Sequence, residues 1–374
     1  EPDSMAFNMV VPNDLMAVGN GNLRRTSAYS DHQTLYEWFI SYPINNYNIS
    51  LNVADYAHFS DVYTAQDGSK LNCDYYVLKE NIEKAKEHFK QVLGVLEAFE
   101  YYFGKYPFWD DGFALIETPY LGMEHQSGIA YGNKYMRGYL GGMIPKGMDW
   151  DYIIVHETGH EYWGNSISCN DHAEMWIHES FTTYMESLYV EYHFGKQKAI
   201  DYLKMQRMFI ENRLPLIGPL DVNFEKFGSS DHYYKGAWIL HTLRNVFNDD
   251  TLWFETLKDL HEENKLSHLT TEDIIHFFES RSGLKLGNFF EQYLHHPKPP
   301  TFVYEEIKGK KKTELIYKWE SNVDDFSMPL NIGKGENEFW IYPTSNEWQT
   351  LKYKNKTPIE IRKDLFYIKT NKKT

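Results

Sequence analysis

The sequence has few cysteines, no long apolar run and little clustered positive charge, and each absence argues against a class of protein. Its only two cysteines, Cys73 and Cys169, argue against a disulfide framework but do not decide the redox compartment. No apolar run approaches the roughly 18 residues that a membrane-spanning helix requires. The formal net charge of -15 argues against nucleic acid or an anionic membrane as a partner, because phosphate binding requires clustered lysine and arginine.

The amino acids that are present indicate a globular chain of more than one domain. Its 374 residues are 42% apolar and 17% aromatic, enough for two or three domains with a sizeable core. The only short basic run is "KGKKK", residues 308–312, which stands between the β-rich strings "TFVYEEI" and "TELIYKW". We interpret this run as a solvated hairpin turn rather than as a binding patch.

The pattern of apolar residues changes twice along the chain. Up to about residue 60, β-branched and aromatic residues cluster between Pro and Asn-Gly punctuation, which predicts strands. After a change near residues 61–68, helical spacing dominates as far as "HHPKPP", residues 295–300, which is typical of a helix end and a linker. We therefore predict an α+β multidomain protein with an N-terminal β-sheet domain (1–60), a mainly helical domain (61–298) and a small C-terminal β-sandwich (299–374).

A string that can hold a metal ion, "HETGHEYWGN", occupies residues 156–165. His156 and His160 are four residues apart, so on a helix both project from one face and can bind one zinc ion through neutral imidazoles. A catalytic zinc needs one more protein ligand, and Glu179 follows His160 after eighteen intervening residues. The break at "GNSISCN" lets a second helix turn Glu179 toward the histidines, so we predict a zinc site with an open fourth position.

The helix that carries Glu179 is predicted over residues 171–195. Asp171 is its expected N-cap, and Glu174, three positions on, is the expected acid of a capping box. Glu186 lies two helical turns beyond Glu179 on the same face. It either orients a ligand histidine by bonding to the ring nitrogen that faces away from the metal or is an ordinary surface acid.

Glu157 directly follows the first histidine and is turned about 100° around the helix from it. It can therefore face the open zinc position, where bound water has a pKa of about 7. Glu157 can accept the proton of that water and pass it to a leaving amine. The HExxH string alone is a weak signal, because such strings also occur on ordinary polar helices; the carboxylate on a second helix strengthens it.

With two further motifs, this signature resembles the M1 zinc aminopeptidases, which are aminopeptidase N-like members of the gluzincin group. The string "GMEHQSG", residues 122–128, is similar to the family's Gly-x-Met-Glu-Asn exopeptidase motif. The string "YYKGA", residues 233–237, resembles the Tyr-x-Lys-Gly string that holds its catalytic tyrosine. The motifs stand in the family's order, and the resemblance covers nearly the whole chain.

The resemblance implies catalytic and metal-binding roles for the matching positions. Glu157 would be the general base, with zinc-bound water as the nucleophile. Tyr233 would donate a hydrogen bond to the oxyanion, which a neutral phenol can do at pH 7. One Zn2+ per chain would be held by His156, His160 and Glu179.

The resemblance also implies a binding site for the substrate's N-terminus. Glu124 would receive the free α-amine, and the chain around Gly122, Met123 and His125 would line the peptide. His125 departs from the family's usual Asn, which puts affinity and pH dependence in doubt, because an unperturbed His titrates near pH ~6.5. The family's second amine-binding residue comes from a part of its N-terminal domain that has no counterpart here.

The family's architecture fits the predicted organisation. It implies that residues 1–60 are the last portion of an N-terminal β-saddle, most of which would precede Glu1. Residues 61–298 would be a thermolysin-like catalytic domain and residues 299–374 a small β-sandwich. The large helical C-terminal domain of many members has no counterpart in this sequence, so we expect a more open cleft.

The resemblance thus predicts a zinc-dependent aminopeptidase that hydrolyses the N-terminal peptide bond of peptides. Expected partners are peptides with a free N-terminus and the missing N-terminal segment of its own precursor. Two alternatives stay open: an open-cleft metallo-endopeptidase or related hydrolase, and a non-catalytic scaffold that retains the fold. The chain shows no signal-peptide pattern and does not begin with Met, so we expect either a cytoplasmic protein or a processed periplasmic or cell-envelope protein.

Overall fold

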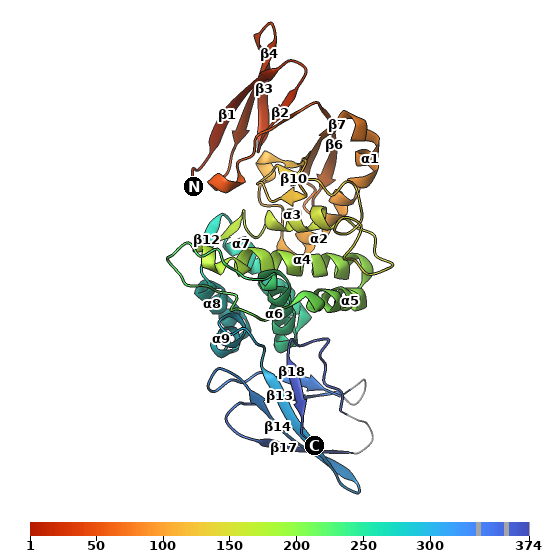
Figure 1. Ribbon diagram of the computed structural model, residues 1–374, viewed down its shortest axis with the longest axis vertical. Coiled ribbons are helices and arrows are strands. Elements are labelled where there is room, and N and C mark those ends of the chain that lie inside the picture. The colour runs from red at the N-terminus through yellow and green to blue at the C-terminus, as the bar shows by residue number, and fades with distance from the viewer. Residues whose placement is uncertain (334–337, 355–358, 374) are drawn as a thin grey trace. The chain divides into compact units, whose positions relative to one another are not determined.

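The computed structural model describes residues 1–333, 338–354 and 359–373 and has a mixed α+β fold, as predicted (Figure 1). Its α-helices are α1 (Ile82–His88), α2 (Gln91–Phe103), α3 (Tyr152–His160), α4 (Trp176–Phe194), α5 (Lys196–Gln206), α6 (Asp231–Phe247), α7 (Asp250–Glu263), α8 (Thr271–Ser282) and α9 (Gly287–Leu294). Its strands are β1 (Met5–Pro12), β2 (Met16–Val18), β3 (Asn22–Ser30), β4 (Gln33–Ile40), β5 (Asn52–Ala54), β6 (Tyr56–Thr64), β7 (Lys70–Leu78), β8 (Phe113–Glu117), β9 (Gly122–Met123), β10 (Ile129–Tyr131), β11 (Ile167–Cys169), β12 (Ser267–Leu269), β13 (Thr301–Lys308), β14 (Lys312–Glu320), β15 (Leu330–Ile332), β16 (Phe339–Ile341), β17 (Gln349–Lys354) and β18 (Lys369–Lys372). Within these described residues, no helix combines the length and the apolar character needed to cross a membrane.

Two compact units, each assembled from several stretches of chain, divide the protein. The first consists of residues 1–168, 177–205 and 257–268. The second consists of residues 169–176, 206–256 and 269–374. The division into three sequence-contiguous domains stays a prediction.

The first unit contains two larger sheets. In one of them β4 pairs antiparallel with both β1 and β3 (Figure 1). The other has the order β6-β7-β8-β10-β9, in which β8 runs parallel to β7 and to β10, and β9 runs antiparallel to β10. Among the described residues, β9 has a neighbour on one side only, so the other side of this edge strand can pair with a further strand.

One apolar cluster joins the two sheets of the first unit. Its members include Trp38 of β4, Tyr76 of β7 and Ile116 of β8. The rings of Trp38 and Tyr76 meet edge to face with centroids 6.2 Å apart, and Nε1 of Trp38 donates to the carbonyl of Ala17 at 3.1 Å. Burying such side chains stabilises a fold by about 1.5–3 kcal/mol each, so this cluster ties the N-terminal strands to the sheet that ends in β9.

The first unit also corrects the prediction that strand character ends near residues 61–68. Strands β6 and β7 run antiparallel from Tyr56 to Leu78, and Gly68, with φ +82°, lies in the turn between them. Alternate residues of β7 are fully buried: Leu71, Cys73, Tyr75 and Val77. The alternation of these apolar residues with Asn72 and Asp74 is the period of two typical of a strand, and the predicted boundary did not take it into account.

The second unit contains α6, α8 and α9 and the C-terminal strands. Strands β17, β14, β13 and β18 form a four-stranded sheet in that order, and β15 pairs with β16. The pairing of β13 with β14 extends to Lys308 opposite Thr313, and the residues between them are exposed, so the predicted hairpin turn at "KGKKK" is confirmed. Strand content after residue 299 is likewise confirmed, whereas its assignment as a β-sandwich domain stays a prediction.

The predicted capping of the helix at 171–195 is wrong. Asp171 accepts from the N–H of Ala173 and caps a short 3-10 turn at residues 172–174, and α4 begins only at Trp176. The carboxylate of Glu174 accepts from the N–H of Thr271 at 2.7 Å. Glu174 is thus engaged by the start of α8, a long-range contact that a local capping rule does not contain.

Candidate metal centre

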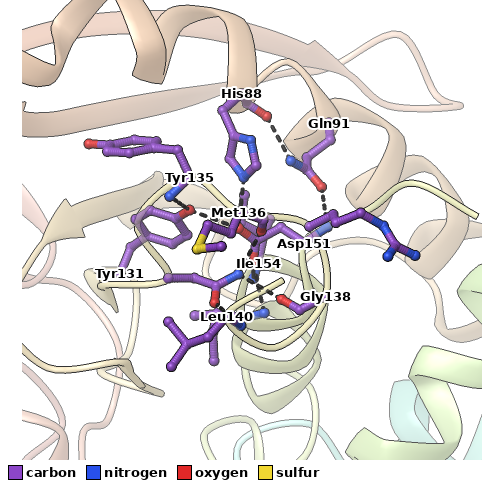
Figure 2. A network of polar contacts seen from close by, with 12 residues as sticks. His88, Gln91, Tyr131, Tyr135, Met136, Gly138, Leu140, Asp151 and Ile154 are labelled. Carbon is purple, nitrogen blue, oxygen red and sulfur yellow. Dashed lines mark hydrogen bonds and ion pairs between the residues drawn. The ribbon is translucent and has the colours of Figure 1, made fainter. Parts of the chain in front are cut away.

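Helix α3 carries the HETGH string, and a buried N-cap fixes its first turn. Oδ1 of Asp151 accepts from the N–H groups of Ile153 at 2.8 Å and Ile154 at 3.3 Å. Figure 2 shows the other side of this carboxylate: Oδ2 lies 2.7 Å from Nε2 of His88 and accepts from the hydroxyl of Tyr131 at 2.8 Å. These bonds satisfy a fully buried carboxylate and tie the start of α3 to α1 and β10.

The structure brings the three predicted metal ligands together within the first unit. Nε2 of His156 lies 3.2 Å from Nε2 of His160, and Oε2 of Glu179 lies 3.6 Å and 3.3 Å from these two nitrogens. A tetrahedron with metal–ligand bonds of about 2.0–2.1 Å has edges of about 3.3–3.4 Å. Two imidazole nitrogens and one carboxylate oxygen at these separations fit Zn2+ with one position left open.

A glycine between the two histidines allows α3 and α4 to approach closely. A Cβ atom built on Gly159 would lie 3.0 Å from Cγ2 of Thr182 and 3.7 Å from Sδ of Met185, both on α4. This is closer than side chains ordinarily pack, so a larger residue would push the helices apart. Gly159 thereby brings Glu179, which is also on α4, within reach of the histidines.

Both imidazoles are oriented from the side that faces away from the cluster. Nδ1 of His156 lies 2.7 Å from Oε1 of Glu186, whose other oxygen accepts from the hydroxyl of Tyr202 at 2.6 Å. Nδ1 of His160 lies 2.9 Å from the carbonyl oxygen of Trp163. Because a carbonyl only accepts, Nδ1 of His160 carries a proton, and Nε2 is the nitrogen that faces the cluster. Glu186 holds His156 in the same tautomer.

Glu186 gives a first test of this arrangement. We expect Glu186→Gln to weaken zinc binding by about 10- to 100-fold, because the amide can no longer hold His156 as a carboxylate does. Competition with a chromogenic chelator measures the affinity. Glu191→Gln, near the end of the same helix, is the matched control, and equal affinities in both variants would contradict this role for Glu186.

The carboxylates and imidazoles of the cluster shift one another's pKa values toward the charged forms. Burial opposes a charged imidazole at His160, but the carboxylates of Glu179 and Glu124 outweigh it and raise the pKa of His160 to about 9, so a metal ion that binds Nε2 must displace a proton from this ring. Burial likewise opposes a charged Glu179, but the histidines hold the pKa of its carboxyl well below the usual range. Glu179 is therefore anionic at neutral pH, the form required of a metal ligand.

Glu157 faces the motif that contains Gly122. A Cβ atom on Gly122 would lie 2.7 Å from Oε1 of Glu157, so a larger residue there would displace this carboxylate. Burial raises the pKa of Glu157 to about 7; His156 and His160 lower it, and Glu124 raises it further. A carboxylate with a pKa near neutral is suited to exchange protons during a reaction.

The residues of the "GMEHQSG" string lie beside this cluster. Gly122 and Met123 form the edge strand β9, and Glu124 and His125 follow it. The side chains of Glu124, Glu157 and His160 each offer an atom within 4.8 Å of the others. Burial lowers the pKa of His125 below its usual value, against the charge of Glu124, so His125 is neutral at pH 7.

Tyr233 is the one predicted site residue outside the first unit. It lies in the first turn of α6 in the second unit, where its N–H donates to the carbonyl of Ser230 at 3.1 Å. Its role as the oxyanion donor stays a prediction.

The sequence did not single out three polar residues that shape the centre. Asp151 carried an available signal, because an Asp before an apolar helical stretch is typical of an N-cap. Glu161 and Asn165 stand inside the "HETGHEYWGN" string, but their partners are distant in the sequence. Glu161 accepts from the hydroxyl of Tyr106 at 2.7 Å and from the N–H of Ser127 at 3.0 Å, and burial raises its pKa to about 8.

Comparisons with known proteins agree with the motifs. Residues 87–293 match the peptidase family M1 domain. The chain is 20% identical over 290 residues to aminopeptidase N of Escherichia coli K12, covering 74% of this chain and 33% of that protein. It is 25% identical over 201 residues to aminopeptidase N of Lactobacillus helveticus, covering 48% of this chain and 23% of that protein. This chain therefore spans a third or less of the length of these relatives.

A solved structure shares the fold. Aminopeptidase A of Legionella pneumophila, in complex with aspartic acid, superimposes with a TM-score of 0.73 at 16% identity, covering 95% of this chain and 43% of that chain. At this identity the likeness shows the arrangement of the chain, not its substrate.

Proposed function

This chain belongs to peptidase family M1, and we propose that it is a zinc-dependent aminopeptidase that removes N-terminal residues from peptides. The observation that carries the proposal is the position of Glu124, whose carboxylate lies within 4.8 Å of atoms of Glu157 and His160. An anionic group at that place can hold a substrate ammonium group one residue from the metal. The family's finer architecture is part of the proposal: a saddle remnant at 1–60, a thermolysin-like domain at 61–298 and a sandwich at 299–374.

The proposed chemistry divides among a few side chains. His156, His160 and Glu179 would hold one Zn2+, which supplies Lewis-acid polarisation of the scissile carbonyl and of the attacking water. Glu157 accepts a proton from that water and returns it to the departing amine. Tyr233 would donate a hydrogen bond from its phenol to the developing oxyanion and would keep its proton.

The edge strand and Glu124 would set the position of the substrate. The side of β9 that lacks a neighbouring strand among the described residues can pair with an extended peptide, next to Gly122 and Met123. Glu124 then attracts the ammonium group, so that the first peptide bond lies at the metal. The neutral ring of His125 adds no positive charge that would repel the ammonium group.

Hydrolysis of one peptide series tests the proposal. The series has free and N-acetylated N-termini and is assayed with and without a chelator. Chelator-sensitive release of single residues from free peptides alone is the expected result. Cleavage of both forms would instead indicate an endopeptidase, and no cleavage by the zinc-loaded protein would indicate a scaffold.

Replacing Glu124 tests how the N-terminus is recognised. We expect Glu124→Ala to lower kcat/KM for free peptides by about 10- to 100-fold, because a hydrogen bond to a charged group contributes about 1.5–3 kcal/mol. Residual cleavage of acetylated peptides should be unchanged. The exposed Glu83→Ala is the control, and equal losses on free and acetylated peptides would mean that Glu124 does not recognise the amine.

A further inference from the structure

The loop that carries Glu124 is hydrogen-bonded to the chain that leaves the metal-binding helix. Nδ2 of Asn165 donates to the carbonyl oxygen of Glu124 at 2.8 Å. We propose that Asn165 is a positioning residue that holds Glu124 at a fixed distance from His160 and so determines how many residues are removed at each cleavage. This inference rests on the proposed aminopeptidase function.

Asn165 is itself anchored to a proposed metal ligand. Its N–H donates to the carbonyl of His160 at 3.0 Å, in the turn that directly follows α3. This turn passes through Gly164, whose φ of +125° favours glycine, and a Cβ there would lie 3.3 Å from Nδ1 of His160. One residue therefore contacts the main chain of both His160 and Glu124.

Both polar atoms of the Asn165 side chain are engaged, which fixes its direction. Its Oδ1 accepts from Nδ2 of Asn48 at 2.7 Å, and its Nδ2 also lies 3.2 Å from Oε1 of Glu161. Asn165, Asn48 and Glu161 are all buried. A buried amide with its partners in place cannot turn over without leaving polar groups unpaired, so its bond to the Glu124 carbonyl is held firmly.

The far end of the loop is held in the same way. The N–H of Ser127 donates to Oε1 of Glu161 at 3.0 Å, and the N–H of Gly21 donates to the hydroxyl of Ser127 at 3.0 Å. Ser127 has a φ of +54°, which a non-glycine residue keeps only where its surroundings impose it. Asn20 adds a bond from Nδ2 to the carbonyl of Gln126 at 2.7 Å. The loop is thus fixed at residues 124, 126 and 127.

This rigidity matters because adjacent peptide bonds of an extended substrate are only about 3.3–3.6 Å apart. A displacement of Glu124 by that distance would bring the second peptide bond to the metal instead of the first. Glu124 itself is held through its carbonyl oxygen by Asn165, which is bonded in turn to the carbonyl of His160. Removing the hydrogen bond from Asn165 to the Glu124 carbonyl should therefore change both the strength of amine recognition and the length of the product.

Asn165→Asp tests the proposal, since it keeps the acceptor for Asn48 but places an oxygen against the Glu124 carbonyl. We expect the preference for free over acetylated peptides to fall by at least about tenfold, because a misplacement of about 1 Å can cost about 100-fold in rate. Dipeptides should appear among the products in mass spectrometry. The loss should fall on KM for free peptides, and bound zinc should be unchanged.

The matched control is Asn133→Asp. Asn133 is also fully buried in the first unit, and its Nδ2 donates to the carbonyl of Gly138 at 2.7 Å. The Asn133→Asp variant should lose about as much thermal stability as Asn165→Asp, but it should still release single residues from free peptides. Asn165→Ser, which is smaller and uncharged, serves if Asn165→Asp does not fold. Equal effects of the Asn133 and Asn165 changes would overturn the proposal.

Peptide binding separates a failure of this inference from a failure of the proposed function. Calorimetry in the Glu157→Gln background measures the binding of free and acetylated peptides without turnover. Equal binding of both peptides before Asn165 is changed would refute amine recognition, and the inference with it. A preference that survives Asn165→Asp in a folded, zinc-loaded protein would refute the positioning role alone.

Discussion

Glu157→Gln should lower kcat by about 100- to 10,000-fold while zinc content stays at the wild-type level. The amide has nearly the size of the carboxylate and fits against Gly122, but it cannot accept a proton from the attacking water. Burial raises the pKa of Glu157 to about 7, which suits a general base. We therefore expect the substitution to remove a proton acceptor. Steady-state kinetics on a free peptide and metal analysis of the same sample measure the two quantities.

A second buried glutamate supplies the control for Glu157. Glu100 of α2 is 6% exposed and accepts from the N–H of Gln66 at 3.1 Å, in a separate hydrogen-bonded group. Glu100→Gln should alter thermal stability without a comparable loss of kcat. Wild-type turnover by the Glu157→Gln variant would show that another group removes the proton.

His160→Ala should lower zinc affinity by more than about 100-fold, because removing a ligand costs more than removing its orienting partner. The remaining pair, His156 and Glu179, cannot complete a tetrahedral site. Zinc should also stop protecting the fold: at about 100 times Kd a bound ligand stabilises the native state by about 2.7 kcal/mol, and the variant should lack this increment at the same zinc concentration. Thermal unfolding with and without zinc measures the difference independently of activity.

An exposed histidine supplies the control for His160. His276 of α8 has a side chain that is 69% exposed, so His276→Ala should leave both zinc affinity and zinc-dependent stabilisation unchanged. In the wild-type protein, a chelator should abolish activity and added zinc should restore it. Tight zinc binding by His160→Ala would mean that the metal is held elsewhere.

The sequence predicted which residues of the candidate metal centre lie together. The four-residue spacing of His156 and His160 requires a helix to make them neighbours, and α3 is helical over that interval. Glu179 was identified by its spacing and by the resemblance to a family, and it lies 3.3 Å from Nε2 of His160. Glu186, two turns further along α4, was placed on the same face by helical periodicity alone.

Other features were decided only by contacts between distant segments. Strand β7 pairs with β6 on one side and with β8 on the other, and β8 begins at Phe113, 35 residues after β7 ends at Leu78, so the sheet around β7 depends on segments that are distant in the sequence. Glu174 does not take part in the predicted capping box, because its carboxylate accepts a hydrogen bond from the N–H of Thr271 at the start of α8.

The sequence by itself determined which residues share a helix face, because that depends on spacing along one element. Helical spacing predicted His156, His160 and the adjacent base Glu157, and the resemblance of the motifs to a family predicted the family and supported Glu179 as the third ligand. Only the tertiary structure decided how these groups are held: the carboxylate of Asp151 meets His88 and Tyr131, and Asn165 reaches the carbonyl of Glu124. Such hydrogen bonds join residues 20 to 63 positions apart, and their formation depends on the packing of whole elements rather than on any local preference of the chain.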